Sequence, residues 1–299
     1  MAGSIRALRT DRARRRGRLR QAARARSARH GISRFVRTPS AIIGLVLTVA
    51  LLVIAALADQ IAPYDPLALV GPPLIAPSAT HLMGTDDLGR DLFSGVVHGT
   101  RTSLAIAAGV GALVLVVGLA IGIAAGYRGG MIDDLLMRFT ELFQVLPRFF
   151  LAIVVIALFG PGLDRLIIVL GLTSWPTLAR IVRAHTLSLR EREFVEAARA
   201  LGASELRIIS HDILPNVMPT AVVMLALVMG QVLLLEASLG FLGLGDPNAV
   251  SWGYLAGQAQ RFLRVAWWLS LFPGLALVLA VLAFNLFADG LNDLLDRRH

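Results

Sequence analysis

Apolar residues in this chain are gathered into long blocks that are separated by shorter polar segments. Each block is about as long as a helix that crosses the ~30 Å hydrocarbon core of a bilayer, which takes roughly 20 residues. In chain order the blocks cover residues 40–58, 104–127, 135–159, 166–184, 217–239 and 266–287. The pattern predicts an all-α polytopic membrane bundle with six transmembrane helices.

The polar segments between the blocks divide the chain into parts. We expect an Arg-rich cytoplasmic tail over 1–37, a first transmembrane helix over 38–59, an extracytoplasmic loop over 60–102, a five-helix core over 103–289 with a cytoplasmic loop over 185–215, and a cytoplasmic tail over 290–299. Ala56-Leu57-Ala58 resembles a signal-peptidase site, but the basic segment before this block is longer than that of a cleaved signal. We therefore expect the first block to remain as a membrane helix.

The distribution of arginine predicts the orientation of these helices. All 29 residues counted as Lys and Arg are Arg, and 13 of them lie within residues 1–37. With both termini in the cytoplasm, 23 of the 29 fall in cytoplasmic segments, as the positive-inside rule requires. A nucleic-acid-binding arm is the alternative interpretation of the basic tail. Nothing near the tail supplies base-reading elements or aromatic stacking residues, so we expect no nucleic-acid partner.

Composition excludes several kinds of chemistry. The chain is 56% hydrophobic and 16% charged, whereas soluble domains average about 25% charged residues. It has no lysine, which a P-loop needs to reach nucleotide phosphates, and no cysteine to form a disulfide or a thiolate metal site. The histidines are scattered and do not form an H-E-x-x-H motif. We therefore expect no enzyme activity, cofactor or metal in this chain.

Small residues and prolines inside the blocks predict how the helices pack. Gly118, Gly122 and Gly126 are spaced by four residues, so they share one helical face and allow another backbone to approach closely. We favour packing within the chain over a seam between two copies. Pro147 and Pro176 lie inside the third and fourth blocks, where each frees a backbone carbonyl and favours a kink.

The segment 185–215, HTLSLREREFVEAARALGASELRIISHDILP, differs from the apolar blocks because it is dense in charge. Its apolar residues, which recur at roughly helical spacing, are Phe194, Val195, Ala198 and Leu201. This pattern predicts an amphipathic helix, a turn over 202–204, a second short helix and a boundary at Pro215. The apolar face suits docking into a groove of a partner protein, and a solvated linker is the alternative.

Part of this segment resembles a known motif. Glu196-Ala197-Ala198, followed by Gly202 and later by Ile213-Leu214-Pro215, is similar to the EAA loop of importer-type ABC permeases. Where the family pattern has Ile, this chain has Asp212, and Ile213 is displaced by one position.

Three further stretches are similar to one branch of that family, the dipeptide/oligopeptide/nickel permeases. They are HLMGTDDLGRDLFSGVVHGTRTSL (81–104), EASLGFLGLGDPNAVSWG (236–253) and WWLSLFPGLALVLAVLAFNLFADGLNDLLD (267–296). The resemblance covers about residues 35–297 and implies a type I ABC importer permease fold in a bacterial inner membrane. The chain resembles the second of two paralogous permeases, the one with the long loop after its first helix.

The resemblance also implies partners and coupling residues. It implies a sister permease, two cytoplasmic ATP-binding subunits that hydrolyse the ATP, and an extracytoplasmic solute-binding protein. In the family the EAA loop docks into a cleft on the ATPase. The coupling residues so implied, together with one apolar residue of the amphipathic helix, are Phe194, Glu196, Ala197, Ala198, Gly202, Ile213, Leu214 and Pro215.

Polar residues inside the blocks are candidates for contact with the solute. A charge in hydrocarbon costs at least ~2.5–3.5 kcal/mol, so it usually faces a cavity or a partner. Arg148 could attract a peptide carboxylate, or it could form an ion pair with an acid of this chain or of the sister permease. Glu236, near the outer end of the fifth block, could close a gate by hydrogen bonding or lie at an interface. The pathway candidates are Glu141, Gln144, Arg148 and Glu236.

Other interpretations are less well supported. The cluster of Asp86, Asp87, Arg90 and Asp91 has no required metal-ligand spacing, so we expect these side chains to be solvated or paired. A secondary transporter would predict inverted repeats with broken helices, and an intramembrane enzyme would predict paired catalytic residues. The sequence shows neither. Dipeptides, longer peptides, nickel complexes and related solutes all stay open as substrates.

Overall fold

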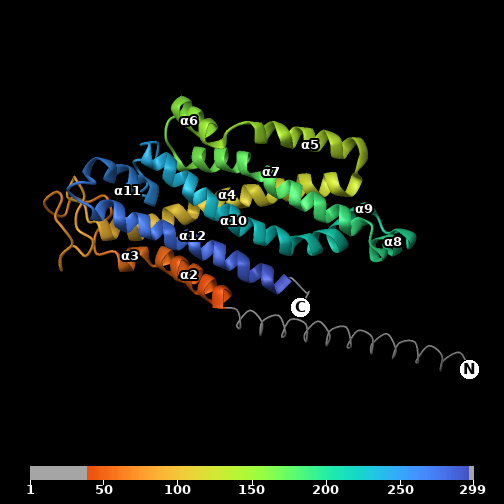
Figure 1. Ribbon diagram of the computed structural model, residues 1–299, viewed down its shortest axis with the longest axis horizontal. Coiled ribbons are helices and arrows are strands. Elements are labelled where there is room, and N and C mark those ends of the chain that lie inside the picture. Colours follow the sequence, from red (N-terminus) through yellow and green to blue (C-terminus); the bar gives the residue numbers. More distant parts are fainter. Residues whose placement is uncertain (1–38, 296–299) are drawn as a thin grey trace, which may run out of the picture.

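The computed structural model describes residues 39–295, and most of these residues are helical (Figure 1). The helices are α2 (Pro39–Ala56), α3 (Ala58–Ile61), α4 (Leu92–Arg128), α5 (Gly130–Val145), α6 (Arg148–Phe159), α7 (Leu163–Arg190), α8 (Glu193–Ala200), α9 (Glu205–Ile208), α10 (Leu214–Phe241), α11 (Trp252–Ala259) and α12 (Trp268–Leu295). A π-helical turn (Ile209–Ile213) joins α9 to α10, and a 3-10 turn (Gln260–Phe262) follows α11. Between residues 39 and 295 the only β pairing consists of two isolated bridges in the loop before α4.

Five helical stretches are long and apolar enough to cross a membrane: α2, α4, α7, the joined stretch Glu205–Phe241, and α12 up to Asp293. A sixth crossing forms only if α5 and α6 are taken together, and these two helices are bent by 73°. The bend falls at Pro147, which has no N–H to donate and disfavours helical geometry in the residue before it. The kink predicted at Pro147 is thus a break, whereas α7 runs through Pro176 as one helix.

Helices α4 and α7 pack against each other along much of their length. A Cβ atom at Gly122 would lie 2.6 Å from the carbonyl oxygen of Ala179, and one at Gly126 would lie 2.7 Å from that of Arg183. Cβ atoms do not come so close to backbone, so this approach requires glycine. Gly118 packs against the same helix. The prediction that these three glycines pack within the chain is confirmed.

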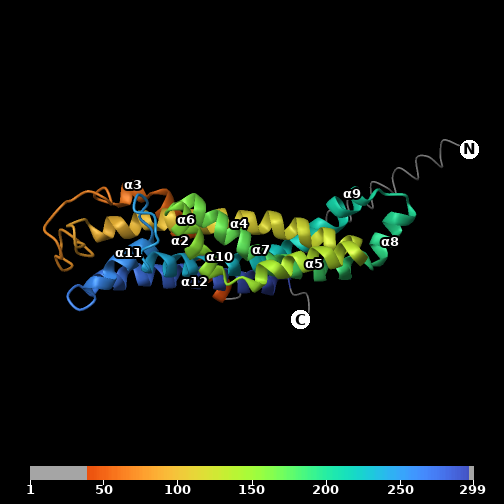
Figure 2. The same cartoon turned by 90° about the horizontal axis from the view of Figure 1, so that it is seen from above.

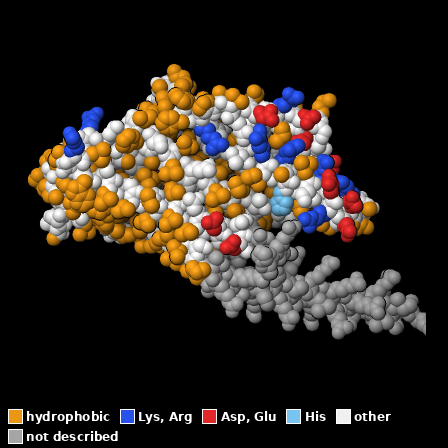
Figure 3. Space-filling view, in the orientation of Figure 1, with side chains coloured by type: hydrophobic (Ala, Val, Ile, Leu, Met, Phe, Trp, Pro, Cys, Tyr) orange, Lys and Arg blue, Asp and Glu red, His pale blue; other side chains and the backbone are white. Residues whose placement is uncertain are grey.

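The remaining long helices lie alongside this pair (Figures 1 and 2). Helix α10 packs on α4, α7 and α12, and α2 lies against α12. Buried aliphatic residues of α4, α7 and α10 form the largest apolar cluster. Many large apolar side chains of α2, α5, α6 and α12 are exposed, and the face in Figure 3 is largely hydrophobic over the middle of the molecule. This surface suits contact with lipid or with helices of a partner.

Several predicted boundaries differ from the structure; for example, α7 continues to Arg190, inside the predicted loop 185–215. Helix α4 begins at Leu92, inside the predicted loop 60–102, because the Asp91 carboxylate caps it by accepting a 2.8 Å hydrogen bond from the Ser94 N–H. Helix α12 continues to Leu295, into the predicted tail. The boundary expected at Pro215 coincides with the start of α10 at Leu214, but the chain stays helical there, because the π-helical turn leads directly into α10. Pro215 lies in the first turn of α10, where a missing N–H is tolerated. The tail over 1–37 lies outside the described residues.

Candidate coupling loop and transport surfaces

Helices α8 and α9, here called the projecting helix pair, extend from one end of the bundle (Figures 1 and 2). Helix α11 and the loop before α4 lie at the opposite end. On the face shown in Figure 3, most charged side chains gather at the end that carries the projecting pair. The molecule therefore has one polar projection attached to a mainly apolar body.

The turn between α8 and α9 depends on Gly202. Its φ of 79° is a left-handed conformation that strains residues with a Cβ atom. The Gly202 N–H donates to the Arg199 carbonyl at 2.9 Å, and the Ala203 N–H donates to the Ala198 carbonyl at 3.1 Å, which closes the end of α8. A Cβ atom at Gly202 would meet nothing within 4 Å. The predicted turn is confirmed, and the space beside its glycine is open.

The apolar residues of α8 divide between two environments. Val195 is fully buried and Ala198 is half-buried against the main core, so the prediction that Val195 belongs to a docking face is wrong. This side of α8 faces its own bundle. Phe194 is 42% exposed and Leu201 is 88% exposed. Leu206 of α9, which the sequence analysis did not single out, is 77% exposed and adds to the same projection.

The other coupling candidates also fall into two groups: some lie at the exposed end of the projecting helix pair, and some lie where the pair joins the bundle. Glu196 and Ala197 are exposed on α8. Ile213 is fully buried and Leu214 is half-buried where the π-helical turn enters α10, whereas Pro215 is exposed. A partner can contact the exposed group, whereas the buried residues can only hold the projecting helix pair on the bundle.

Arg190 at the end of α7 and Arg199 of α8 both contact the end of α4. The Arg190 guanidinium donates to the carbonyls of Gly126 and Tyr127 at 3.3 and 3.4 Å. The Arg199 guanidinium lies 5.3 Å from the centre of the Tyr127 ring, within cation–π range. On the neighbouring helices, the Arg183 guanidinium pairs with the Asp133 carboxylate and so ties α7 to α5. These contacts restrict how the projection can move independently of the bundle.

The pathway candidates on α5 and α6 lie near the break between these helices. The Arg148 guanidinium donates to the Thr177 hydroxyl of α7 at 3.2 Å and makes no ion pair within residues 39–295. Glu141 lies 3.8 Å from Arg180, and both side chains are largely exposed. Gln144 is exposed as well. An ion pair of Arg148 with an acid of the described chain is therefore absent.

The fourth candidate, Glu236, lies elsewhere, between α10 and the start of α11. It is almost fully buried, and its carboxylate accepts a 2.5 Å hydrogen bond from the Ser251 hydroxyl. The same hydroxyl oxygen accepts from the Tyr254 N–H at 3.1 Å and caps α11. The structure thus makes Glu236 a link that holds the loop over 242–251 and α11 on the end of α10.

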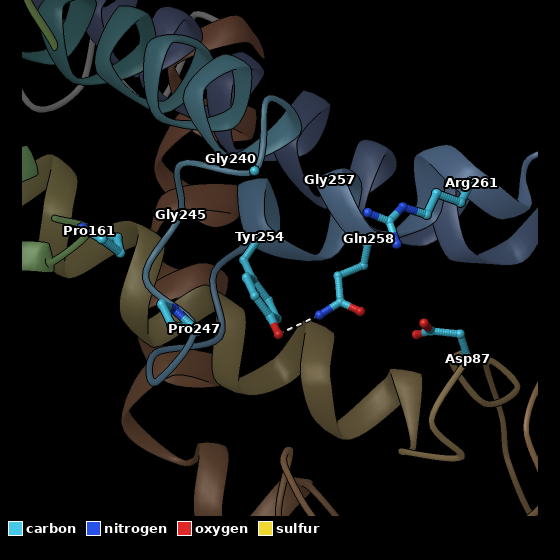
Figure 4. Close-up of a pocket in the computed structure, with 10 residues that line it drawn as sticks. Asp87, Pro161, Gly240, Gly245, Pro247, Tyr254, Gly257, Gln258 and Arg261 are labelled. Atoms are coloured by element: carbon cyan, nitrogen blue, oxygen red, sulfur yellow. Dashed lines mark hydrogen bonds between the residues drawn. The ribbon is translucent and has the colours of Figure 1, made fainter. Parts of the chain in front are cut away.

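A pocket of about 400 Å³ lies beside this link (Figure 4). It is lined by Asp87, Pro161, Gly240, Gly243, Gly245, Pro247, Tyr254, Gly257, Gln258 and Arg261. Part of this lining lies in the segment 236–253, which carries the family resemblance. No sequence signal pointed to Tyr254, Gln258 or Arg261.

The charged cluster before α4 is mostly paired, as expected. The Asp86 carboxylate accepts from the N–H groups of Leu88 and Arg90 and lies 3.6 Å from the Arg90 guanidinium. Burial nevertheless raises the pKa of Asp86 above its ordinary value. The Asp91 carboxylate lies 2.9 Å from the His81 ring nitrogen. Between residues 39 and 295 no group of three His, Cys, Asp or Glu side chains is arranged to hold a metal ion.

Another ion pair links the short helix α3 to α4. The Arg101 guanidinium donates to Asp59 at 2.9 Å, and this hydrogen bond lowers the pKa of the Asp59 carboxyl. Both side chains are largely exposed, so the pair contributes little to stability.

The fold is that of the type I ABC importer permeases. Two solved structures, titled as inward-facing conformations of the MetNI methionine ABC transporter, have this fold. The matched chains are 21% identical to this one, with TM-scores of 0.54 and 0.57. The matches cover 67% and 68% of this chain and 96% and 97% of those chains.

Family models identify the branch. The model for the binding-protein-dependent transport system inner membrane component matches residues 118–299, and the model for the N-terminal TM domain of oligopeptide transport permease C matches residues 28–88. The chain belongs to the ABC importer permeases of the dipeptide/oligopeptide/nickel family.

Curated relatives agree with this assignment over most of their length. The chain is 44% identical to a protein of Brucella suis whose name assigns it to a peptide transport system, covering 89% of this chain and 90% of the relative. It is 38% identical to the dipeptide transport system permease of Alkalihalophilus pseudofirmus, covering 90% and 89%. It is 40% identical to the nickel transport system permease of Escherichia coli K12, covering 84% and 92%. Permeases of this kind are membrane components, not enzymes.

Proposed function

We propose that this chain forms, together with a sister permease, the membrane pathway of an ATP-driven importer for peptides or a related small solute. A binding protein outside the membrane delivers the solute, and two cytoplasmic ATPase subunits supply the energy. The N- and C-termini lie in the cytoplasm. Peptides are favoured because two of the three relatives compared above are named for peptide or dipeptide transport.

The observation that carries this proposal is the exposed apolar tip of the projecting helix pair. Phe194, Leu201 and Leu206 are exposed at the end of the molecule where charged residues gather. Large apolar side chains on such a polar projection are uncovered by their own chain, and a groove on a protein partner is the surface that suits them. An ATPase that docks at this tip therefore acts on the two helices that flank the projecting helix pair, α7 and α10.

The connection from the tip into the bundle supports a mechanism. Helix α9 passes through the π-helical turn into α10, and α10 extends to Glu236 and the pocket at the other end. Closure of the ATPase displaces the tip, and α10 transmits the displacement because it is one packed element. The two ends of the bundle then change together between two states, as alternating access requires.

Co-purification from detergent-solubilised membranes tests the docking role, with Gly202→Asp compared with the wild type. The substitution adds a charge to the open space beside the turn, and we expect it to release the ATPase while the sister permease stays bound. Gly130→Asp is the matched control, because Gly130 also has a positive φ (56°) and open space around its Cβ position. Retention of the ATPase by Gly202→Asp, or its equal loss from Gly130→Asp, would contradict docking at this tip.

A further inference from the structure

The pocket beside α11 contains an acid and a base that do not pair with each other. Asp87 comes from the loop before α4, and Arg261 comes from the 3-10 turn after α11 (Figure 4). Neither side chain makes an ion pair with any residue in the described part of the chain. One Asp87 carboxylate oxygen, Oδ1, is buried and has no hydrogen-bond partner there. Buried polar atoms normally have partners, so a carboxylate that lines the pocket with one oxygen unsatisfied is a candidate to pair with a ligand there.

The neighbouring acid, Asp86, is paired within its own loop and does not line the pocket. Asp86 is occupied by the backbone N–H groups of its own turn and by Arg90. Asp87 instead lines the pocket. The two adjacent carboxylates therefore have different roles: the first holds the loop in shape, and the second presents negative charge to the pocket.

Neutral polar groups and bare backbone complete the site. Gln258 donates to the Tyr254 hydroxyl, and both side chains line the pocket to one side of Asp87 and Arg261 in Figure 4. Gly257 packs directly on the backbone of Gly240, so α11 comes very close to the end of α10 at the pocket. Such a lining offers hydrogen bonds without adding charge, which suits the amide groups of a peptide.

We propose that this pocket is a reception site for the charged ends of a short peptide, with the ammonium group on Asp87 and the carboxylate on Arg261. A guanidinium binds a carboxylate through two parallel hydrogen bonds, and a carboxylate accepts from an ammonium group. The volume of about 400 Å³ lies within the range of small-molecule sites and suits a peptide of a few residues. The site lies at the end opposite the projecting helix pair, where solute from a binding protein arrives.

This inference rests on the proposed function, because it assumes that peptides are the solute. It adds a prediction that the function alone does not make: each end of the peptide is recognised by its own residue. Blocking one end of the peptide should therefore be equivalent to removing one charge of the pocket.

Titration of the complete transporter in nanodiscs by saturation-transfer NMR tests the site. The probes are Ala-Ala, N-acetyl-Ala-Ala and Ala-Ala amide. We expect the wild type to bind Ala-Ala about tenfold more tightly than either blocked peptide, as loss of one charged hydrogen bond predicts. Asp87→Asn should abolish only the preference over the acetylated peptide, and Arg261→Gln only the preference over the amide. The charge-conserving variants Asp87→Glu and Arg261→Lys should keep both preferences.

Control variants remove a like charge outside the pocket. Arg264→Gln neutralises an exposed arginine three positions from Arg261, and Asp65→Asn neutralises an exposed acid of the same outer loop as Asp87. Both should bind as the wild type does. The proposal is overturned if the wild type does not discriminate between the peptides, or if either pocket variant loses both preferences together.

Uptake of labelled Ala-Ala by the same preparation in proteoliposomes separates this proposal from the proposed function. ATP-dependent uptake without any preference for free peptide ends would leave the importer in place and overturn the site. Absence of ATP-dependent peptide uptake by the wild type would overturn the peptide assignment itself.

Discussion

At the residue scale, the glycines of α4 set the distance between the two most closely packed helices. Gly122 faces the backbone of α7, whereas Gly274 of α12 has nothing within 4 Å of its Cβ position. We expect Gly122→Ala to lower the free energy of unfolding by about 1–3 kcal/mol, since an added methyl group overpacks the contact. Gly274→Ala should be neutral or raise it by up to about 1 kcal/mol, because alanine favours helix. Thermal unfolding of the purified chain in detergent measures both, and equal effects would contradict the packing.

The free guanidinium of Arg148 is the second residue-scale feature, because its hydrogen-bond partner is a neutral hydroxyl. We predict that Arg148→Ala lowers the uptake of peptide at limiting concentration about tenfold, as loss of one charged hydrogen bond to the solute implies. Thr177→Val removes the partner hydroxyl and leaves the charge, so it should transport nearly as the wild type does. Unchanged apparent affinity and rate in Arg148→Ala would remove Arg148 from the pathway.

At the scale of elements, one hydroxyl group forms a buried polar link between α10 and α11, in addition to their close backbone packing. Ser251 caps α11 and donates to the buried Glu236 carboxylate. Ser251→Ala should cost about 1 kcal/mol for the lost cap and about 1–3 kcal/mol for the carboxylate left without this donor. Glu236→Gln keeps an acceptor for Ser251 and should cost less. Limited proteolysis of the loop over 242–251 measures the loosening, and equal cleavage of the two variants would show that the link does not hold the loop.

The sequence predicted the elements better than it predicted their ends and their contacts. Block length and hydropathy located the membrane helices, and the spacing of the α4 glycines identified a packing face, because both signals are local. The break at Pro147 and the smooth passage through Pro215 have opposite outcomes although both residues are proline. Both prolines lie at the start of a helix, but the residues before them differ: Leu146 is extended (φ −76°, ψ 122°), the geometry that a following proline favours, whereas Leu214 stays helical (φ −53°, ψ −48°).

The candidate sites were also predicted only in part, because sequence patterns report local features and not contacts between distant segments. The EAA-like residues and the turn at Gly202 were found from sequence, but the burial of Val195 depends on where α8 lies against the bundle. The outer pocket combines Asp87 with Arg261, which are far apart in the chain. Local patterns do not report such long-range pairs, so no sequence signal indicated this combination.

At the scale of the whole molecule, the two ends of the bundle should face opposite sides of the membrane. The chain has no cysteine, so single cysteines can be introduced without background from the chain itself. Met131→Cys lies at the end with the projecting pair and is 86% exposed in the wild type, and Asn248→Cys lies in the exposed loop at the other end. An impermeant maleimide should label Asn248→Cys in intact cells and Met131→Cys only after permeabilisation. The reverse pattern would contradict the proposed orientation.

The most direct test of the account is peptide uptake by proteoliposomes that hold the complete transporter, with and without ATP. We predict that the wild type and Gly130→Asp accumulate peptide only with ATP, and that Gly202→Asp does not accumulate it because the ATPase no longer drives α10. Peptide uptake without ATP by this chain alone would contradict the account and indicate a secondary carrier.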